Sequence, residues 1–468
     1  MTTKEARAGY IAILLATAWG ATALGQTSGG NSEIWARGYG GPGHEHVSGV
    51  APDRGGVVYT AGKIHGEATF GAAKLVSSGA DALVAALGKD GAVLWAHALG
   101  GPGADEARAV AVLPEKDLFV VGSFSGTADF DPGPGRTELV STGATDVFVL
   151  RLTPDGALVW ARRLGGPQAD TGLDVAVDTR GVYVTGSFQG APGTEWAGLK
   201  SAGKSDGFVA KLDLAGNPQW ARRIGGSQQD EARSVALEAG GEVWVAGTFE
   251  GKAGIGPEEG TTTLESAGRS DGFLAHFAPD GRLHWAGRFG GKESDAALAV
   301  TVGPVGVWVT GRFAGTADFD PGPTVTSIIS SGKSDAFVAR FAKTGHLRWV
   351  QRSGGRAFDF GTGIAATPEG EVWALSNNEV RTAGDGPDPD SGDDRATLLL
   401  FDREGQRKNI RELVGEKGLR ALDLALDSAG NPCVAAVFRG NGGVMTGFGD
   451  TRLLNAGETD ALVARIVK

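Results

Sequence analysis

Three features of the 468-residue sequence predict an all-β fold, namely a seven-bladed β-propeller with four antiparallel strands per blade. A tryptophan recurs about every 60 to 65 residues, each interval contains four short runs rich in valine, phenylalanine and tryptophan, and Asp-Gly or similar turns separate these runs. Four strands repeated at a fixed period are typical of propeller blades. Nothing in the sequence resembles an amphipathic helix of ordinary length.

The repeat occupies residues 35–468 and leaves no room for a second domain. Its tryptophans are Trp35, Trp95, Trp160, Trp220, Trp285 and Trp349, and Ile410 takes this position in a seventh copy. We expect residues 35–468 to form one domain. The tryptophans on expected strands, with Trp244, Trp308 and Trp373, are expected to pack between blades.

The third copy illustrates the four expected strands, which lie near residues 174–178, 181–188, 206–213 and 220–226. Each is short, rich in β-branched or aromatic residues and bounded by Gly or Asp. Turns such as 89–91 and 279–281 contain Asp-Gly, in which glycine accepts a positive φ angle. If the tryptophan strand is the outermost of its blade, the first strand of the chain completes the last blade. If it is innermost, each repeat is a whole blade and the ends are not joined; we prefer the first arrangement because it leaves no open edge.

The repeat resembles the SBBP-type β-propeller repeat family of bacterial exported proteins. The resemblance rests on Trp-Ala-Arg, Gly-Gly, Val-Ala-Val-Asp, Val-Tyr-Val-Thr-Gly-Ser-Phe, Ser-Ala-Gly-x-x-Asp and Phe-Val-Ala-Lys-Leu. It covers residues 35–468, with the last two copies more divergent. It implies a seven-bladed ring and no single activity, because a fold alone does not define a function.

The N-terminus has the pattern of a secretory signal peptide. A weakly basic start is followed by an uncharged apolar run, and Ala23-Leu24-Gly25 provides small residues for cleavage before Gln26. We expect residues 1–25 to be a signal peptide and 26–34 a short linker. The alternative is an uncleaved anchor, for which the apolar run is short. No other segment is apolar enough to span a membrane, so the mature protein is expected in the periplasm, on the cell surface or secreted.

Composition excludes several functions. The formal net charge of −11 argues against nucleic acid as a partner. A single cysteine, Cys433, excludes an internal disulfide framework and cysteine-based metal clusters. No nucleophile elbow, Walker loop or His-Glu-x-x-His motif is present. His44 and His46 flank Glu45, but a third well-spaced zinc ligand is missing, so a solvated turn is the preferred interpretation.

Length variation among the repeats is confined to the loop between the second and third strands. This loop emerges on the same side of the ring as the blade-to-blade connection, and we call this side the long-loop face. Loops tolerate insertion and often carry function, so a ligand is expected on this face. Trp196, within one such loop, is the aromatic residue best placed to contact a sugar.

An acidic residue stands ten positions after each tryptophan, in the blade-to-blade connection. These positions allow a ring of carboxylates at the channel mouth that attracts a cation. The preferred interpretation is structural, with each carboxylate accepting backbone N–H groups in its own turn. The same interpretation applies to the aspartates that open the third strands. The connection acids are Glu45, Asp105, Asp170, Asp230, Asp295 and Asp359.

Two loops share the sequence Thr-Ala-Asp-Phe-Asp-Pro-Gly-Pro, at 127–134 and 316–323. Their Asp-x-Asp pairs, Asp129 with Asp131 and Asp318 with Asp320, have the ligand type that Ca²⁺ prefers, although EF-hand spacing is absent. The alternative is a proline-stiffened turn in which Asp bonds its own backbone. The acidic loop of the sixth copy, residues 385–394, is expected to be solvated rather than a third cation site. No cofactor is required, and Ca²⁺ is the one candidate.

These observations favour an exported, non-catalytic propeller that binds a protein or glycan through its long-loop face. The alternatives are a carbohydrate-active enzyme that uses carboxylates at the channel mouth, and a purely structural component of the envelope or matrix.

Overall fold

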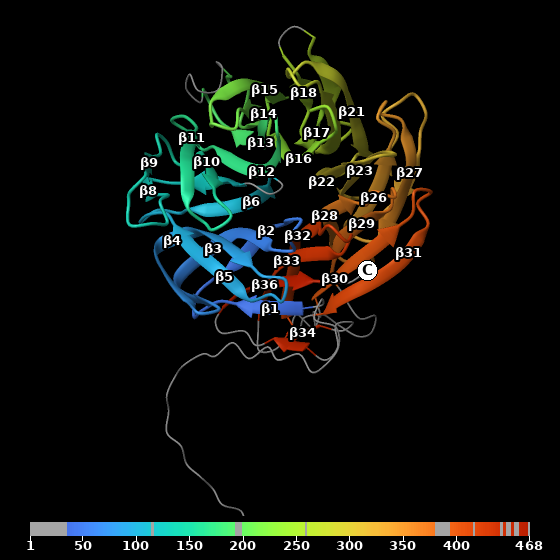
Figure 1. Ribbon diagram of the computed structural model, residues 1–468. Coiled ribbons are helices and arrows are strands. Elements are labelled where there is room, and N and C mark those ends of the chain that lie inside the picture. Colours follow the sequence, from blue (N-terminus) through green and yellow to red (C-terminus); the bar gives the residue numbers. More distant parts are fainter. Residues whose placement is uncertain are drawn as a thin grey trace, which may run out of the picture.

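The computed structural model describes residues 35–113, 117–191, 199–257, 260–379, 394–414, 417–439, 443–445, 451–453 and 458–466. Within these residues the chain forms strands and no helix. Seven antiparallel sheets, one per blade, are arranged around a central axis (Figure 1). Each contains the four strands of its blade, and two are extended to six strands by a hairpin of the next blade. The predicted seven-bladed propeller is thereby confirmed. The predicted signal peptide and linker, 1–25 and 26–34, lie outside the described residues.

Each blade begins with an inner strand that faces the axis and continues to a second strand through a tight turn. The inner strands are β2 (His46–Pro52), β6 (Glu106–Val112), β12 (Thr171–Asp178), β16 (Glu231–Leu237), β22 (Ala296–Gly303), β28 (Asp359–Ala366) and β32 (Lys417–Leu426). The second strands are β3 (Val58–Phe70), β7 (Leu118–Phe124), β13 (Gly181–Phe188), β17 (Val243–Phe249), β23 (Gly306–Phe313), β29 (Val372–Glu379) and β33 (Pro432–Arg439).

The third strand of each blade pairs with the second strand on one side and with the outer strand on the other. The third strands are β4 (Ala73–Leu87), β10 (Asp146–Leu152), β14 (Asp206–Leu212), β20 (Asp271–Phe277), β26 (Asp335–Phe341), β30 (Asp394–Phe401) and β36 (Asp460–Arg465). The outer strands are β5 (Val93–Leu99), β11 (Leu158–Leu164), β15 (Pro218–Gly226), β21 (Leu283–Gly291), β27 (Leu347–Ser353), β31 (Arg407–Val414) and β1 (Trp35–Tyr39).

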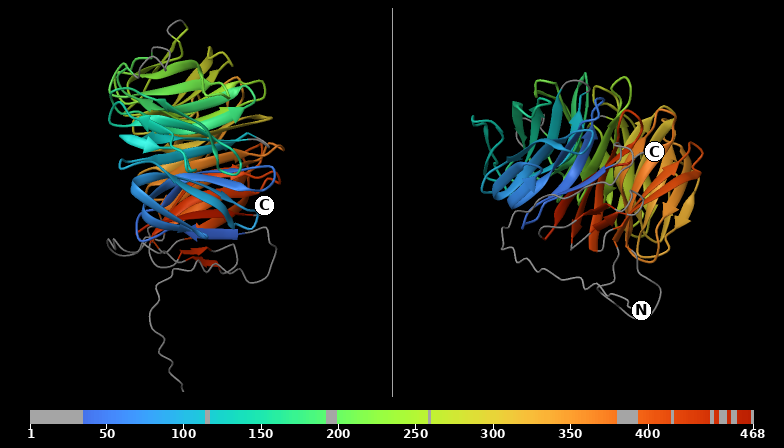
Figure 2. Two further views of the ribbon diagram at one scale, coloured as in Figure 1. Left: turned by 60° about the vertical axis from the view of Figure 1, so that its left-hand side comes forward. Right: turned by 60° about the horizontal axis from the view of Figure 1, so that its bottom comes forward.

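The first strand of the ring completes the last blade. β1 pairs antiparallel with β36, and the seventh sheet has the order β1-β36-β33-β32. The first and last coloured segments of the chain therefore lie in one sheet (Figure 2). This arrangement requires the tryptophan strand to be outermost, as predicted from the need to leave no open edge.

The outer-strand tryptophans join neighbouring blades. The indole N–H of Trp35, in the seventh blade, donates to the carbonyl of Lys89 at 2.7 Å, in the turn between the third and outer strands of the first blade. Gly91 of this turn has a φ of 76°, and a Cβ atom there would lie 2.7 Å from the Trp35 ring. The Asp-Gly turn therefore needs glycine for its backbone and for its contact with tryptophan. Four other outer tryptophans donate in the same way, namely Trp95, Trp160, Trp220 and Trp349.

The longest loops on the long-loop face fold into small hairpins instead of reaching over the axis. These hairpins are β8 (Thr127–Asp129) with β9 (Glu138–Val140), β18 (Lys252–Ile255) with β19 (Thr262–Glu265), and β24 (Thr316–Asp318) with β25 (Ser327–Ile329). β18 pairs with β15 and β24 pairs with β21, each the outer strand of the preceding blade. The extra length thus links neighbouring blades at their outer edges. A further hairpin, β34 (Gly443–Met445) with β35 (Thr451–Leu453), belongs to the last blade.

Candidate functional site

The central channel is lined by side chains that a β-bulge in each inner strand directs toward the axis. Every inner strand contains a β-bulge at the same position, where one residue has no pairing partner on the second strand. A bulge redirects a side chain and often borders a functional site. All seven bulge residues line one cavity of about 380 Å³ in the channel, namely Ser48, Arg108, Leu173, Arg233, Leu298, Thr362 and Leu422.

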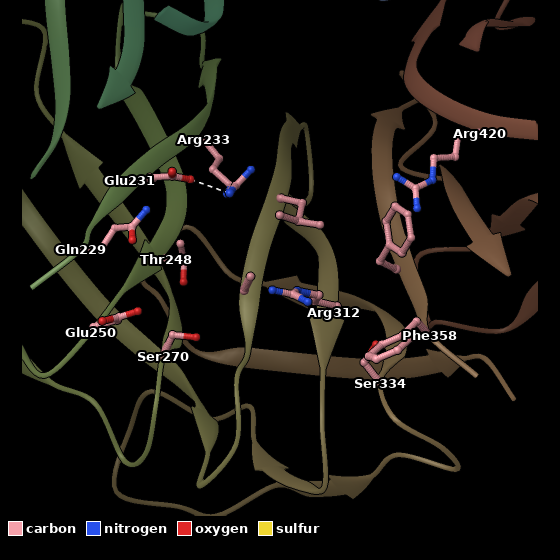
Figure 3. A pocket seen from close by; sticks show the side chains of 13 residues that line it. Gln229, Glu231, Arg233, Thr248, Glu250, Ser270, Arg312, Ser334, Phe358 and Arg420 are labelled. Carbon is pink, nitrogen blue, oxygen red and sulfur yellow. Dashed lines mark ion pairs between the residues drawn. The ribbon is translucent and has the colours of Figure 1, made fainter. Parts of the chain in front are cut away.

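A second cavity of about 520 Å³ opens at the long-loop face and shares Arg233, Leu298 and Phe360 with the first. Figure 3 shows side chains from neighbouring blades around this hollow, which we call the mouth cavity. Its volume lies within the range of ordinary ligand pockets, roughly 300–1,000 Å³. It is lined by Gln229, Glu231, Arg233, Thr248, Glu250, Ser270, Ala296, Leu298, Arg312, Ser334, Phe358, Phe360 and Arg420.

Among the described residues, only one of the three arginines that line the mouth cavity forms an ion pair. Arg233 pairs with Glu231 at 2.5 Å. Arg312 and Arg420 are exposed and form no ion pair within the described part of the chain. The wall opposite Glu231 is aromatic: Phe358 is 42% exposed, and the Arg420 guanidinium lies 5.7 Å from the centre of the Phe360 ring. The Lys333 ammonium lies 4.6 Å from the centre of the Phe358 ring. The cavity therefore combines two arginines that form no ion pair among the described residues with two phenyl rings.

Deeper in the channel the charges are paired. Glu106 approaches His46 Nε2 at 3.0 Å and the Arg108 guanidinium at 2.9 Å. Burial by itself would raise the pKa of Glu106. The hydrogen bond with His46 and the charges of Arg108 and Lys63 outweigh burial, and the pKa falls to about 2. This part of the channel therefore presents ion-paired side chains to a ligand, although Arg108 Nε has no hydrogen-bond partner among the described residues.

The six connection acids lie at the blade junctions and not on the channel wall, since all are at most 1% exposed. Asp230 is representative: Oδ2 accepts the N–H of Gly226 at 2.7 Å, and Oδ1 accepts the N–H of Glu250 at 3.0 Å. Its own N–H donates to the carbonyl of Ser205 in the preceding blade at 2.9 Å. The bond from the backbone four residues earlier recurs at all six acids, Glu45, Asp105, Asp170, Asp230, Asp295 and Asp359. These bonds support the turn-forming interpretation of the ring of acids.

Each connection acid lies near the aspartate that opens a third strand. At Gly225, the first glycine of a Gly-Gly pair, an added Cβ would lie 2.7 Å from both Asp206 Oδ1 and Asp230 Oδ2. The two carboxylates therefore flank one backbone carbon, which explains why glycine stands there. Asp206 also accepts from Arg223 at 3.2 Å, while its Oδ1 has no hydrogen-bond partner among the described residues.

Burial raises the pKa of five of the connection acids. The pKa rises to about 7 for Glu45 and to about 6 for Asp105, Asp170, Asp230 and Asp295, although backbone N–H donors oppose the shift. The neighbouring aspartate adds to the increase in each case. The stability of the blade junctions is therefore expected to depend on pH.

The calcium candidates bond to their own loops. Asp129 Oδ1 accepts the N–H groups of Asp131 at 3.1 Å and Thr137 at 2.9 Å, and Asp131 Oδ1 accepts from Gly133 at 2.8 Å. Asp318 and Asp320 repeat this pattern in the equivalent hairpin. Neither pair belongs to a group of three clustered ligands among the described residues.

We therefore expect Ca²⁺ to leave the melting temperature unchanged. The loop itself already supplies donors to one oxygen of each carboxylate, so the hairpin needs no cation to hold its shape. Differential scanning fluorimetry in millimolar Ca²⁺ and in EGTA measures this, because a ligand of the native state must stabilise it. A calcium-dependent rise that disappears in the double variant Asp129→Asn with Asp318→Asn contradicts the expectation.

The remaining sequence candidates are separated from one another. His44 approaches Glu458 at 2.6 Å, His46 faces Glu106 in the channel, and Glu45 accepts from Gly41. The three adjacent residues therefore point to different partners and do not form one zinc site. Trp196 and the acidic residues 385–393 lie outside the described residues.

Sequence reasoning missed the bulge residues because their chemical types differ from blade to blade. A search for identical residues at a fixed period finds the framework. One signal in the sequence could have revealed the channel wall. In six copies the residue thirteen positions after the outer tryptophan differs in chemical type from copy to copy. A variable position in a constant framework is where a repeat protein places its specificity.

The fold and the channel define a closed seven-bladed β-propeller whose axial cavity opens on one face. No family model matches the sequence, so the SBBP-type resemblance stays an expectation. The chain is 30% identical over 222 residues to the regulatory protein FlaEY of Caulobacter vibrioides, covering 44% of this chain and 23% of that protein. It is 23% identical over 154 residues to the uncharacterized WD repeat-containing protein L264 of Acanthamoeba polyphaga mimivirus, covering 30% and 11%. The chain thus spans less than a quarter of either relative.

Among solved structures, the WD40 β-propeller domain of Doa1 is similar, with 10% identity and a TM-score of 0.43. That match covers 91% of this chain and 94% of the Doa1 domain. Among the residues that the structure describes, no helix has the length and apolar character needed to cross a membrane.

Proposed function

We propose that the chain is an exported, non-catalytic binding scaffold that recognises a segment of a partner protein in the mouth cavity of its long-loop face. The observation that carries this proposal is that Arg312 and Arg420, which form no ion pair among the described residues, line one cavity with Phe358 and Phe360 at the open end of the channel. The long loops hold blades together at their outer edges, so the contact surface is formed by the channel rim.

The chemistry of the mouth cavity specifies the ligand class. Arg312 and Arg420 suit a carboxylate, to which a guanidinium donates two parallel hydrogen bonds. Phe358 and Phe360 suit an apolar side chain next to that carboxylate. A peptide segment with an acidic residue beside an aliphatic or aromatic one meets both requirements within about 520 Å³.

Neither alternative function gains a comparable observation. The carbohydrate-active enzyme was expected to use the connection acids, which are buried and accept backbone N–H groups. The acids that do line the mouth cavity are Glu250 and Glu231, and Glu231 pairs with Arg233. A purely structural role gives no reason for two arginines without an ion pair in one cavity with the exposed ring of Phe358. Export rests on the signal-peptide pattern of residues 1–25.

Selection from a displayed random peptide library tests the binding proposal. We expect peptides with an acidic residue next to an apolar one to be enriched, and their Kd to be measured by fluorescence anisotropy. Arg312→Glu is expected to weaken binding at least about 30-fold, equivalent to about 2 kcal/mol, because it removes a cation and repels the ligand.

Arg348→Glu is the matched control, since Arg348 is an exposed arginine on the outer strand of the same blade. It carries the same charge reversal away from the cavity and is expected to bind as wild type does. Equal loss in both variants, or no peptide enriched above background, refutes the proposal. If no peptide is selected and a glycan array shows binding of an acidic glycan, the mouth cavity recognises carbohydrate and the proposed peptide ligand is wrong.

A further inference from the structure

Three potential metal ligands meet on the face opposite the mouth cavity, within the blade formed by β16, β17, β20 and β21. Glu242 immediately precedes β17, His276 lies on β20, and His284 lies on β21. One ligand atom from each residue lies within 4.8 Å of the others. The described residues contain no other such group of three.

From this geometry we propose that Glu242, His276 and His284 form a binding site for Zn²⁺. The Glu242 Oε2 atom lies 3.0 Å from His276 Nε2 and 3.2 Å from His284 Nε2. With metal–ligand bonds of about 2.0–2.2 Å, two ligands of a tetrahedral Zn²⁺ lie roughly 3.3 Å apart. The observed separations are therefore close to those that a shared Zn²⁺ imposes.

The buried atoms of the group lack hydrogen bonds. His276 Nε2 and Glu242 Oε2 are both inaccessible, and neither has a hydrogen-bond partner among the described residues despite their separation of 3.0 Å. Their approach consequently lacks the angle of a hydrogen bond. Two buried polar atoms that face each other without a well-aligned hydrogen bond are better satisfied when a third species bonds to both.

The surroundings fix the position of the His276 ring. Trp244, its cross-strand neighbour, stacks on the imidazole with ring centres 4.0 Å apart and planes 3° from parallel. Trp244 donates in turn to Glu238 at 3.3 Å, and Glu238 pairs with Lys343 at 2.6 Å.

The other blades place different chemistry at this position. The residue paired with the outer tryptophan is His276 here, whereas it is Arg151, Lys211, Arg340 and Arg465 in four other blades. In two of those blades the arginine forms an ion pair, Arg151 with Asp117 and Arg465 with Asp427. Only this blade has a histidine, His276, in place of the arginine or lysine at this position, and it has a second histidine, His284, on the outer strand beside it.

The site leaves room for a further ligand. The side chain of His284 is 36% exposed, while that of His276 is 15% exposed, so the group opens to solvent on the side of β21. Three protein ligands with solvent in the fourth position are an arrangement known from Zn²⁺ sites.

Zinc binding is tested on the full chain, prepared without a histidine tag and freed of metal with EDTA. We expect isothermal titration with ZnCl₂ to give one site per chain and Co²⁺ to give the visible absorption of a tetrahedral complex. Glu242→Gln and His284→Ala are each expected to weaken binding by more than about 100-fold, since loss of even an outer-shell partner costs about 10–100-fold.

His346→Ala is the matched control, because His346 is an exposed histidine that belongs to the next blade. It is expected to bind Zn²⁺ as wild type does, and circular dichroism checks that every variant is folded. His284 is partly exposed, so His284→Ala keeps the fold even if Glu242→Gln does not. The proposal is overturned if wild type binds no Zn²⁺, or if His284→Ala binds it as tightly as His346→Ala.

Discussion

Removal of residues 1–39 is expected to destabilise the ring by about 6 kcal/mol or more and to lower the melting temperature by roughly 10 °C. The deletion removes β1, whose Trp35 and Tyr39 are only 2% and 5% exposed. Loss of each buried aromatic side chain costs about 3–5 kcal/mol. The deletion also exposes the edge of β36, which then offers unpaired backbone groups to other molecules.

We call the pairing of β1 with β36, which closes the ring, the latch. Removal of residues 1–33 is the matched control, because it takes away only residues before β1. This variant is expected to melt as the full chain does, in thermal scans at one fixed rate. Trp35→Ala with Tyr39→Ala keeps the strand but removes its two anchors, and should fall between the two truncations. If the two truncated chains melt at the same temperature and both remain monomeric by gel filtration, the latch does not stabilise the ring.

Stability is expected to decrease as the pH rises from 5 to 7.5. The folded-state pKa values of Glu45, Asp105, Asp170, Asp230 and Asp295 are about 6 to 7, above those of unfolded carboxyl groups. The folded chain therefore binds more protons than the unfolded chain in this range, and the stabilisation present at pH 5 is lost as these groups ionise. Each raised pKa corresponds to a contribution on the order of 2–3 kcal/mol. Burial lowers the pKa of His97 and His276, which acts in the opposite direction, but the carboxyl groups outnumber them.

Urea unfolding at several pH values measures this slope. Asp230→Asn removes one titrating group and is expected to flatten the slope by about one proton between pH 5 and 7.5. Asp280→Asn is the control, because Asp280 is fully exposed in a turn and its pKa is lowered, so it does not titrate in this range. A free energy of unfolding that increases from pH 5 to 7.5 contradicts the assigned direction.

The fold was predictable because its determinants are local and repeated. A large aromatic residue at a constant period, Asp-Gly turns and β-branched runs each depend on a few neighbouring residues, and seven copies repeat the same signal. Trp35 illustrates this: its position at the start of the first copy, together with the third-type strand at the end of the chain, was enough to predict the latch.

The candidate sites were less predictable. The sequence led us to expect that Glu45 and its five equivalents accept backbone N–H groups in their own turns. The structure adds that these acids are buried and that one donor stands four residues earlier. Arg233 escaped notice because a bulge inserts one residue and breaks the alternation of the strand. A sequence pattern of period two therefore cannot show that the side chain of the extra residue points toward the axis.

The sequence by itself determined the number of blades, the order of their strands and the closure of the ring, because hydrogen bonding and side-chain alternation within a repeat involve near neighbours. Only the tertiary structure decided which side chains share a cavity. Arg312 and Arg420 come from different blades, and Glu242 is brought to His276 and His284 by the pairing of β17, β20 and β21. These contacts depend on strand register and blade curvature, which place side chains that are distant in the sequence next to one another.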